Sequence, residues 1–166
     1  AVLYATDNGA RIINLSLSGP SGADDLQAAI VYAQLKGVLV VVAAGNQSRD
    51  LSITPAFPTS YLLDNVIGVS ATDESLKLAD ISNYGSGADV AAPGADILST
   101  AMGGGYEWRT GTSMAAPAVA GTLALLAAAR PDLDSTSLRN ALYAGASVNG
   151  LPVTTGAVNA AASLRT

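Results

Sequence analysis

One serine stands in a run of small residues that predicts a tight turn followed by a helix. Residues 111–117 read GTSMAAP, and an alanine-rich stretch continues to residue 129. Ser113 therefore falls at a predicted helix start, where backbone N–H groups lack partners and the helix dipole favours negative charge. This position suits a nucleophile whose reaction develops an oxyanion. The structural alternative is that Thr112 or Ser113 only caps the helix.

An asparagine follows the most apolar segment of the chain. Residues 38–42 read VLVVV, and AAGN follows at residues 43–46. Ligands of open α/β sheets bind at the carboxyl ends of the strands. The side-chain amide of Asn46 could donate a hydrogen bond to an oxyanion there. The alternative is an ordinary turn residue.

The segments that must position these two residues alternate between strand and helix patterns. Residues 12–17 (IINLSL) predict a short strand, which a GPSG turn ends. A helix is predicted from Asp24 to the Lys36-Gly37 pair, because acidic residues favour its first turn and glycine its end. Residues 38–42 predict a strand covered on both faces. This strand–helix–strand unit predicts an α/β fold with a right-handed crossover.

The rest of the chain continues this alternation within one predicted domain. The patterns predict strands at 66–70 and 88–91, a hairpin of 97–100 with 106–109, and helices at 112–129, 134–145 and 157–164. Asp134 is the predicted cap of its helix and Gly145 the end. Residues 111–129 approach the length of a membrane span. Their proline, glycine, threonine and weakly apolar alanine residues favour a buried helix instead.

The first strand pattern lies close to the start of the sequence. A strand as apolar as residues 12–17 usually has neighbours on both sides, but only about one turn of apparent helix precedes it. We therefore expect the chain to begin inside a sheet.

Composition limits the chemistry that the chain can perform. Its 166 residues include 8 Lys and Arg, 13 Asp and Glu, no histidine and no cysteine, for a net charge of −5. The acidic balance excludes a basic nucleic-acid binder. The absence of cysteine excludes disulfides, a thiol nucleophile and Cys-ligated zinc. Without histidine, the commonest general base is missing. The first residues also lack the pattern of a signal peptide.

Taken together, the GTSMAAP run and the upstream AAGN resemble the subtilisin-like serine protease family. Three further segments resemble it in the expected order: NLSLSG at 14–19, VAAPG at 90–94 and GAVNAA at 156–161. The resemblance implies an α/β, parallel-sheet, three-layer subtilisin-like fold, truncated at the N-terminal side. Residues 1–166 would be the C-terminal portion of the peptidase domain.

The resemblance also implies roles for individual residues. Ser113 would be the nucleophile that attacks a peptide carbonyl. Asn46 and the backbone N–H of Ser113 would be the oxyanion donors, roles that are described for this family itself. Ala56 would lie near the base of the primary substrate pocket. The two walls of that pocket would be formed by Ser16, Leu17 and Ser18, and by Ala43, Ala44 and Gly45. These small linings predict an apolar or broad preference for the residue before the cut.

A weak structural cation site is also implied by the resemblance. Its ligands would be Asp89 and the carbonyls of Thr59, Tyr61 and Val66, and its ion calcium or a monovalent cation. Only one carboxylate is offered, whereas hard cations take several oxygen ligands. A solvated Asp89 in a plain loop is the alternative. The chemistry itself would require no cofactor.

The catalytic base is unaccounted for. The family triad runs Asp, His, Ser along the chain, and the first two members would precede the region that opens here. Asp7 is no substitute, because TDNG at residues 6–9 reads as a turn or helix end. We expect part of a secreted serine endopeptidase that hydrolyses protein or peptide substrates through an acyl-enzyme. It would be inactive unless a second polypeptide, the N-terminal half of the domain, supplies Asp and His.

Two other function classes compete with this hypothesis. A non-catalytic, protease-derived module would bind peptides or a partner, and its unpaired strand at residues 12–17 would favour self-association through the sheet edge. A nucleotide-binding α/β protein is the weaker alternative. The glycines at 85–87 and 103–105 lack the strand–loop–helix context that a phosphate loop requires. We expect no nucleic-acid or membrane partner.

Overall fold

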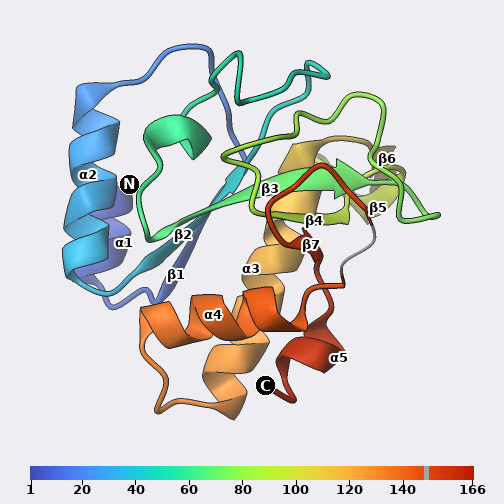
Figure 1. The fold of residues 1–166 in the computed structure, drawn as a ribbon. Helices are drawn as coiled ribbons and strands as arrows, with labels where there is room; N and C mark the ends of the chain where they lie inside the picture. Colours follow the sequence, from blue (N-terminus) through green and yellow to red (C-terminus); the bar gives the residue numbers. More distant parts are fainter. Residues whose placement is uncertain (148–149) are drawn as a thin grey trace.

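The centre of the computed structural model, which describes residues 1–147 and 150–166, is a five-stranded sheet. Its strands run in the order β1-β2-β3-β4-β7, and every neighbouring pair is parallel (Figure 1). They comprise β1 Ile12–Leu15, β2 Leu39–Ala43, β3 Val66–Thr72, β4 Val90–Pro93 and β7 Gly156–Ala157. The parallel sheet confirms the predicted α/β class.

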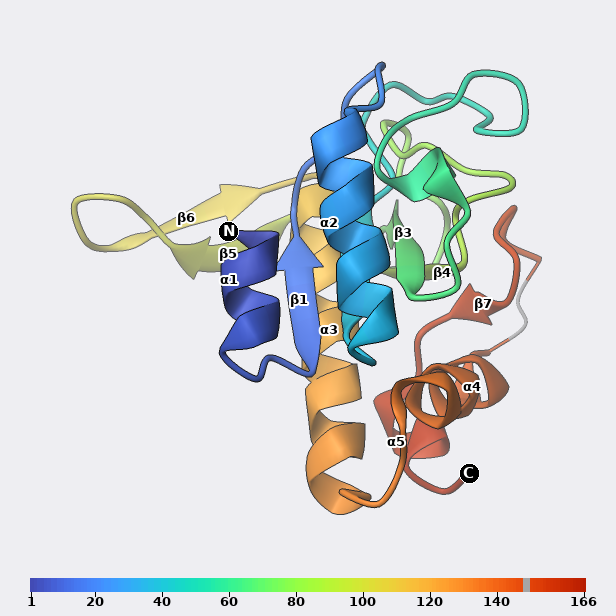
Figure 2. The same ribbon diagram turned by 90° about the vertical axis from the view of Figure 1, so that its left-hand side faces the viewer.

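Helices cover both faces of this sheet. α1 (Val2–Asp7) and α2 (Asp24–Leu35) pack on one face, and α3 (Thr112–Ala129) and α4 (Ser135–Gly145) on the other (Figure 2). Alternate residues of β2 point to opposite faces. Val40 therefore packs in the core with α1 and α2, whereas Val41 packs in the core with α3 and α4. This double burial explains the continuously apolar sequence of β2, and it confirms the predicted three layers.

Outside the sheet, the structure adds a hairpin and two short helical segments. β5 (Ile97–Thr100) and β6 (Tyr106–Arg109) pair antiparallel, as predicted, and project from the body of the molecule (Figure 2). A 3-10 helix covers Thr59–Tyr61, and α5 covers Ala160–Ser163.

The predicted helix at residues 157–164 is wrong at its start. Ala157 belongs to β7 and pairs with Ala91 of β4. Asn159 then caps α5, because its side chain accepts a hydrogen bond of 3.0 Å from the N–H of Ala162. The predicted strand at 88–91 is also displaced, since β4 runs from Val90 to Pro93.

β1 lies at an edge of the sheet. It pairs with β2, and no other strand of residues 1–147 and 150–166 pairs with its second side. The prediction of a fully buried strand at 12–17 is wrong in two respects: the strand ends at Leu15, and only Ile13 within it is buried. The outer edge therefore leaves backbone donors and acceptors available for pairing.

α3 is long and apolar enough, by length and composition, to cross a membrane. In this fold the helix packs along the sheet. Its residues Val119, Leu123 and Leu126 are buried in the same core as Val41.

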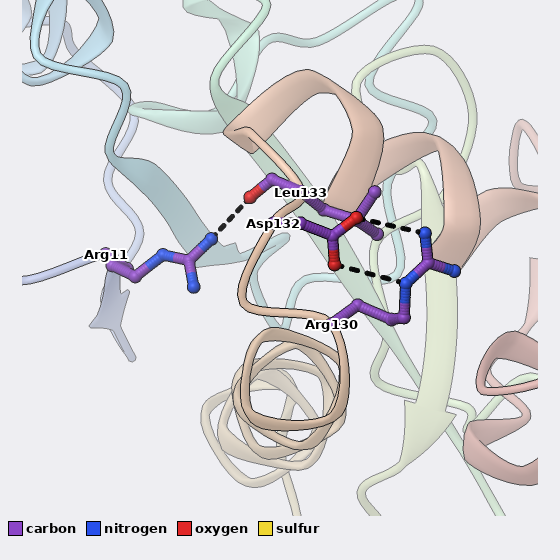
Figure 3. A network of polar contacts seen from close by, with 4 residues as sticks. All are labelled: Arg11, Arg130, Asp132 and Leu133. Carbon is purple, nitrogen blue, oxygen red and sulfur yellow. Dashed lines mark hydrogen bonds and ion pairs between the residues drawn. The ribbon is translucent and has the colours of Figure 1, made fainter.

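The C-terminal end of α3 is tied to the start of β1 by Arg11. The guanidinium of Arg11 donates a hydrogen bond to the carbonyl of Leu133 (Figure 3). It also donates to the carbonyl of Ala127. A cation is favourable there because the last carbonyls of a helix have no partner within it. Arg130 and Asp132 form a neighbouring ion pair at 3.3 Å, in which both side chains are largely exposed.

Replacing Arg11 should destabilise the fold more than replacing Arg130. Arg11→Ala is expected to lower the free energy of unfolding by about 1 kcal/mol, because two carbonyls lose a charged donor. Arg130→Ala should cost less, because exposed ion pairs contribute little to stability. Urea denaturation of both variants measures the difference. Equal costs would contradict a specific role for Arg11.

Candidate active site

The carboxyl ends of three parallel strands converge on the start of α3. After β4, the carbonyl of Gly94 accepts a hydrogen bond from Gly111 at 2.8 Å. After β2, Asn46 contacts Thr112, and after β1, Ser16 contacts Ser113. Such strand ends are where ligands of open α/β sheets bind. The predicted positions of Ser113 and Asn46 are thus brought together with Ser16 in one place.

Ser113 and Ser16 form a reciprocal pair of hydrogen bonds. The Ser113 hydroxyl donates to the carbonyl of Ser16 at 3.1 Å, and the Ser16 hydroxyl donates to the carbonyl of Ser113 at 2.8 Å. Pro117 explains why that carbonyl is available. It lies four residues further along α3, and it has no N–H with which to bond Ser113. The proline thus leaves the Ser113 carbonyl without its helical donor. The hydroxyl of Ser16, in the loop after β1, donates to this carbonyl instead.

Thr112 fixes the orientation of the Asn46 amide. The Asn46 Oδ1 atom accepts from both the backbone N–H and the hydroxyl of Thr112, each at 2.9 Å. The same hydroxyl accepts from the N–H of Gly45 at 3.0 Å. Thr112 is fully buried. With Oδ1 held in this way, the amide must present its Nδ2 group on the other side.

Two N–H donors lie at the start of α3, the helix that carries the Ser113 hydroxyl. No residue in the described ranges accepts a hydrogen bond from Asn46 Nδ2, which lies close to Gly111: a Cβ on Gly111 would meet it at 3.2 Å. The N–H of Ser113 belongs to the first turn of α3 and donates to no acceptor among the described residues. An amide, a helix N-terminus and a hydroxyl together can stabilise an oxyanion formed at a carbonyl that the hydroxyl attacks.

Asn83, which the sequence did not single out, organises the loop that carries Asn46. Its Oδ1 atom accepts from the N–H groups of Gln47 and Arg49 at 3.1 and 3.0 Å, and its Nδ2 donates to the carbonyl of Ala44 at 2.9 Å. Asn83 is completely buried. Asn83 lies in a loop without a regular sequence pattern, 36 residues from Gln47. Its role is therefore visible only in the folded structure, where the two residues are in contact.

The predicted pocket residues occupy different places around the site. Ser18 and Ala56 line one cavity of about 230 Å³. Gly45 borders Ser18 closely, since a Cβ on Gly45 would meet the Ser18 hydroxyl at 2.8 Å. Leu17 is half exposed and does not line this cavity. The other three predicted residues are Ser16, bound to Ser113, and Ala43 and Ala44, buried at the end of β2.

The cavity at the predicted cation site is lined by the positively charged side chain of Arg139. Asp89 lines a cavity of about 210 Å³ together with Thr59 and Val66, two of the predicted ligand residues, but Tyr61 is not among its lining residues. Arg139 of α4 lines the same cavity.

The chemistry of this cavity fits a metal ion poorly. Arg139 donates to the carbonyl of Asp64 and lies 3.7 Å from its carboxylate, so an added cation would meet a guanidinium. Asp89 Oδ2 is also engaged, accepting from Gly68 N–H at 2.7 Å. No group of three or more His, Cys, Asp or Glu side chains suited to a metal occurs within 1–147 and 150–166. Burial raises the pKa of Asp89 to about 6, and the Gly68 hydrogen bond and the charge of Arg139 offset only part of this rise.

The fold and the arrangement around Ser113 define a class of protein, and comparison with known families identifies it. The sequence model of the family described as "Subtilase family" matches residues 1–162. The chain belongs to the subtilase family.

Relatives and solved structures support the same conclusion. The chain is 50% identical over 127 residues to a thermophilic serine proteinase of Bacillus sp. (strain AK1), covering 76% of this chain and 30% of that protein. It is 46% identical over 126 residues to thermitase of Thermoactinomyces vulgaris, covering 76% of this chain and 43% of thermitase. Among solved structures, a protease of Pseudoalteromonas arctica PAMC 21717 superposes with a TM-score of 0.89 at 32% identity, covering 99% of this chain and 56% of that one.

The chain spans half or less of the length of these curated relatives. The parallel-sheet, subtilisin-like fold predicted from the sequence is confirmed by these structural neighbours.

The Ser16–Ser113 pair and Pro117 should be coupled in stability. Ser16→Ala leaves the Ser113 carbonyl without a donor, and we expect it to lower the free energy of unfolding by about 1 kcal/mol. Pro117→Ala restores an N–H that can bond this carbonyl within the helix. In the double variant, the Ser16→Ala cost should largely disappear. A double-mutant cycle by urea denaturation measures this coupling, and strictly additive costs would contradict it.

Asp89 should make the fold less stable as pH rises from about 4 to about 6. Its pKa of about 6 in the folded chain exceeds the ordinary 3.8, so the protonated form is favoured by folding and this contribution is lost as the carboxyl ionises. This pKa difference of about two units corresponds to at most about 3 kcal/mol in the free energy of unfolding. Asp89→Asn should remove this loss of stability. The free energy of unfolding of the variant should therefore rise relative to that of the parent between pH 4 and pH 7.

Urea denaturation of Asp89→Asn and of its parent at pH 4 and at pH 7 measures this difference in stability. Parallel pH profiles of the two proteins would contradict the raised pKa. Calcium added at pH 7 separates the cation hypothesis, since selective stabilisation of the parent would indicate a bound ion.

Proposed function

We propose that this chain is the nucleophile-bearing part of a secreted serine endopeptidase that hydrolyses peptide bonds through an acyl-enzyme. The observation that carries the proposal is the convergence of Ser113, the Asn46 amide and the first turn of α3. Membership of the subtilase family supports a serine protease function. The extracellular location is proposed by analogy with the family.

The chemistry assigns one role to each group at the start of α3. The Ser113 Oγ atom attacks the carbonyl carbon of the substrate, and its proton passes to a base. The carbonyl oxygen becomes an oxyanion that Asn46 Nδ2 and the Ser113 N–H stabilise. Collapse of the tetrahedral intermediate breaks the C–N bond, and the leaving amine takes the proton. Water then hydrolyses the resulting ester by the reverse sequence.

The base must come from outside these 166 residues. The sequence contains no histidine, and the hydroxyl of Ser113 donates to the backbone carbonyl of Ser16, which is too weak a base to activate it. We propose that the N-terminal half of a protease domain supplies Asp and His. The edge of β1 is the place where its strands would continue the sheet.

The same edge supports a second candidate function. A chain with an unpaired β1 could act as a non-catalytic module that pairs with peptides or with its own copies. Light scattering over a concentration series tests whether the chain associates with its own copies. Association of the chain that disappears when an N-terminal protease half is bound would show that both partners compete for one edge.

The proposal predicts that Ser113 becomes reactive only when a base is supplied. A fluorophosphonate probe should label the chain when it is co-expressed with the segment of the Bacillus sp. (strain AK1) proteinase that precedes the matched region. The chain alone should remain essentially unlabelled, because an unactivated serine is an ordinary hydroxyl. Mass spectrometry locates the modified residue, and Ser113→Ala provides the control.

Asn46→Ala tests the oxyanion role in the same complex. Its labelling rate should fall by about 10²–10³, the magnitude measured for the equivalent donor of subtilisin and taken from it. Rapid labelling of the isolated chain, or labelling of the complex that does not depend on Ser113, would refute the proposal.

A further inference from the structure

A cavity beside the candidate active site has a lining that the small residues of the motif do not predict. It measures about 230 Å³ and lies between Ser18, after β1, and the loop after β2. Ala56 forms an apolar and buried part of its lining. This volume is below that of drug-sized ligand pockets and suits a single amino-acid side chain.

Polar groups that line this cavity come from the loop after β2. Gln47 and Arg49 both contribute to its surface. Their backbone N–H groups are bound by the buried Asn83, so the loop conformation is fixed while the two side chains remain exposed. Gln47 Oε1 accepts from Asn83 Nδ2 at 3.2 Å. The amide of Gln47 is therefore oriented, and its Nε2 hydrogens donate to no residue of the described ranges.

The positive charge of Arg49 is not neutralised within the described parts of the chain. No ion pair of Arg49 occurs among residues 1–147 and 150–166, and no carboxylate lines the cavity. Asp50, its neighbour in sequence, is directed elsewhere: its Oδ1 accepts from the N–H of Ser52 at 2.8 Å and lies against Gly85. The cavity thus combines a guanidinium and an amide donor with no acidic counterpart.

We propose that this cavity selects an acidic side chain, glutamate or aspartate, at the substrate residue that precedes the scissile bond. The inference rests on the proposed function, because it places the cavity beside the carbonyl that Ser113 attacks. Arg49 attracts a carboxylate and repels lysine and arginine, and Gln47 adds a neutral donor. This replaces the apolar or broad preference expected from Ser18, Ala56 and their neighbours in the sequence.

The size of the preference follows from the exposure of Arg49. Two unit charges about 4 Å apart in water-like surroundings attract by an amount equivalent to roughly fivefold in a rate or binding constant. The chain as a whole carries a charge of −5, which weakens the approach of every acidic peptide. The ratio between variants, rather than the absolute rate, therefore reports the local effect.

The decisive experiment compares peptides that differ only at the residue before the cut. In the complex that supplies the base, kcat/KM for glutamate should exceed that for glutamine about fivefold, and lysine should be the poorest substrate. Arg49→Ala should abolish the preference for glutamate over glutamine, and Arg49→Glu should make lysine the better substrate. Arg49→Lys should retain most of the preference. Arg165→Ala, which removes an exposed arginine elsewhere, should change nothing.

A binding measurement separates failure of this inference from failure of the proposed function. Acetylated tripeptides that end in glutamate, glutamine or lysine are titrated calorimetrically into the chain and into its Arg49→Ala variant. Tighter binding of the glutamate peptide, lost in Arg49→Ala, would support the inference even if no peptide were cleaved. Equal affinities, or a charge preference that survives Arg49→Glu, would overturn it.

Discussion

The bond between Thr112 and Asn46 is the contact on which the arrangement of the site depends. It joins the end of β2 to the start of α3, and the completely buried Thr112 contributes both a backbone and a hydroxyl donor to it. A buried polar network of this kind stabilises one geometry because any other leaves a donor unsatisfied. The direction of the Asn46 amide is therefore decided by the core of the protein rather than by a ligand.

Close approach of backbones makes this contact possible. A Cβ on Gly94 would lie 2.8 Å from the carbonyl of Gly111, and one on Gly45 would lie 2.5 Å from Asn83. Gly45 also has a φ of +106°, which side chains rarely adopt. Small residues at these strand ends are thus a packing requirement. The hydrogen-bonding side chains of Thr112 and Asn83 fill the space that they leave.

The sequence predicts the elements well where local patterns are strong. The hairpin of β5 and β6 and the limits of α3 agree with the structure, because glycine turns and apolar composition are local signals. Ser113 and Asn46 could likewise be located from motifs at a helix start and a strand end. The limited burial of β1 could not, since burial depends on which strands surround it, and only Ile13 within this edge strand is buried. Arg49 and Arg139 were also missed, because the residues that they contact or share a cavity with come from segments distant in the sequence.

The distance along the chain between the contacting residues has a consequence for folding. Ser16 and Ser113 are 97 residues apart, and Asn46 and Thr112 are 66 apart. Closing loops of this length costs entropy before the contacts are gained, so such pairs form slowly and after local structure. Assembly of the site accordingly requires the chain to have been synthesised as far as α3, because until then a nascent chain cannot form the Ser16–Ser113 pair.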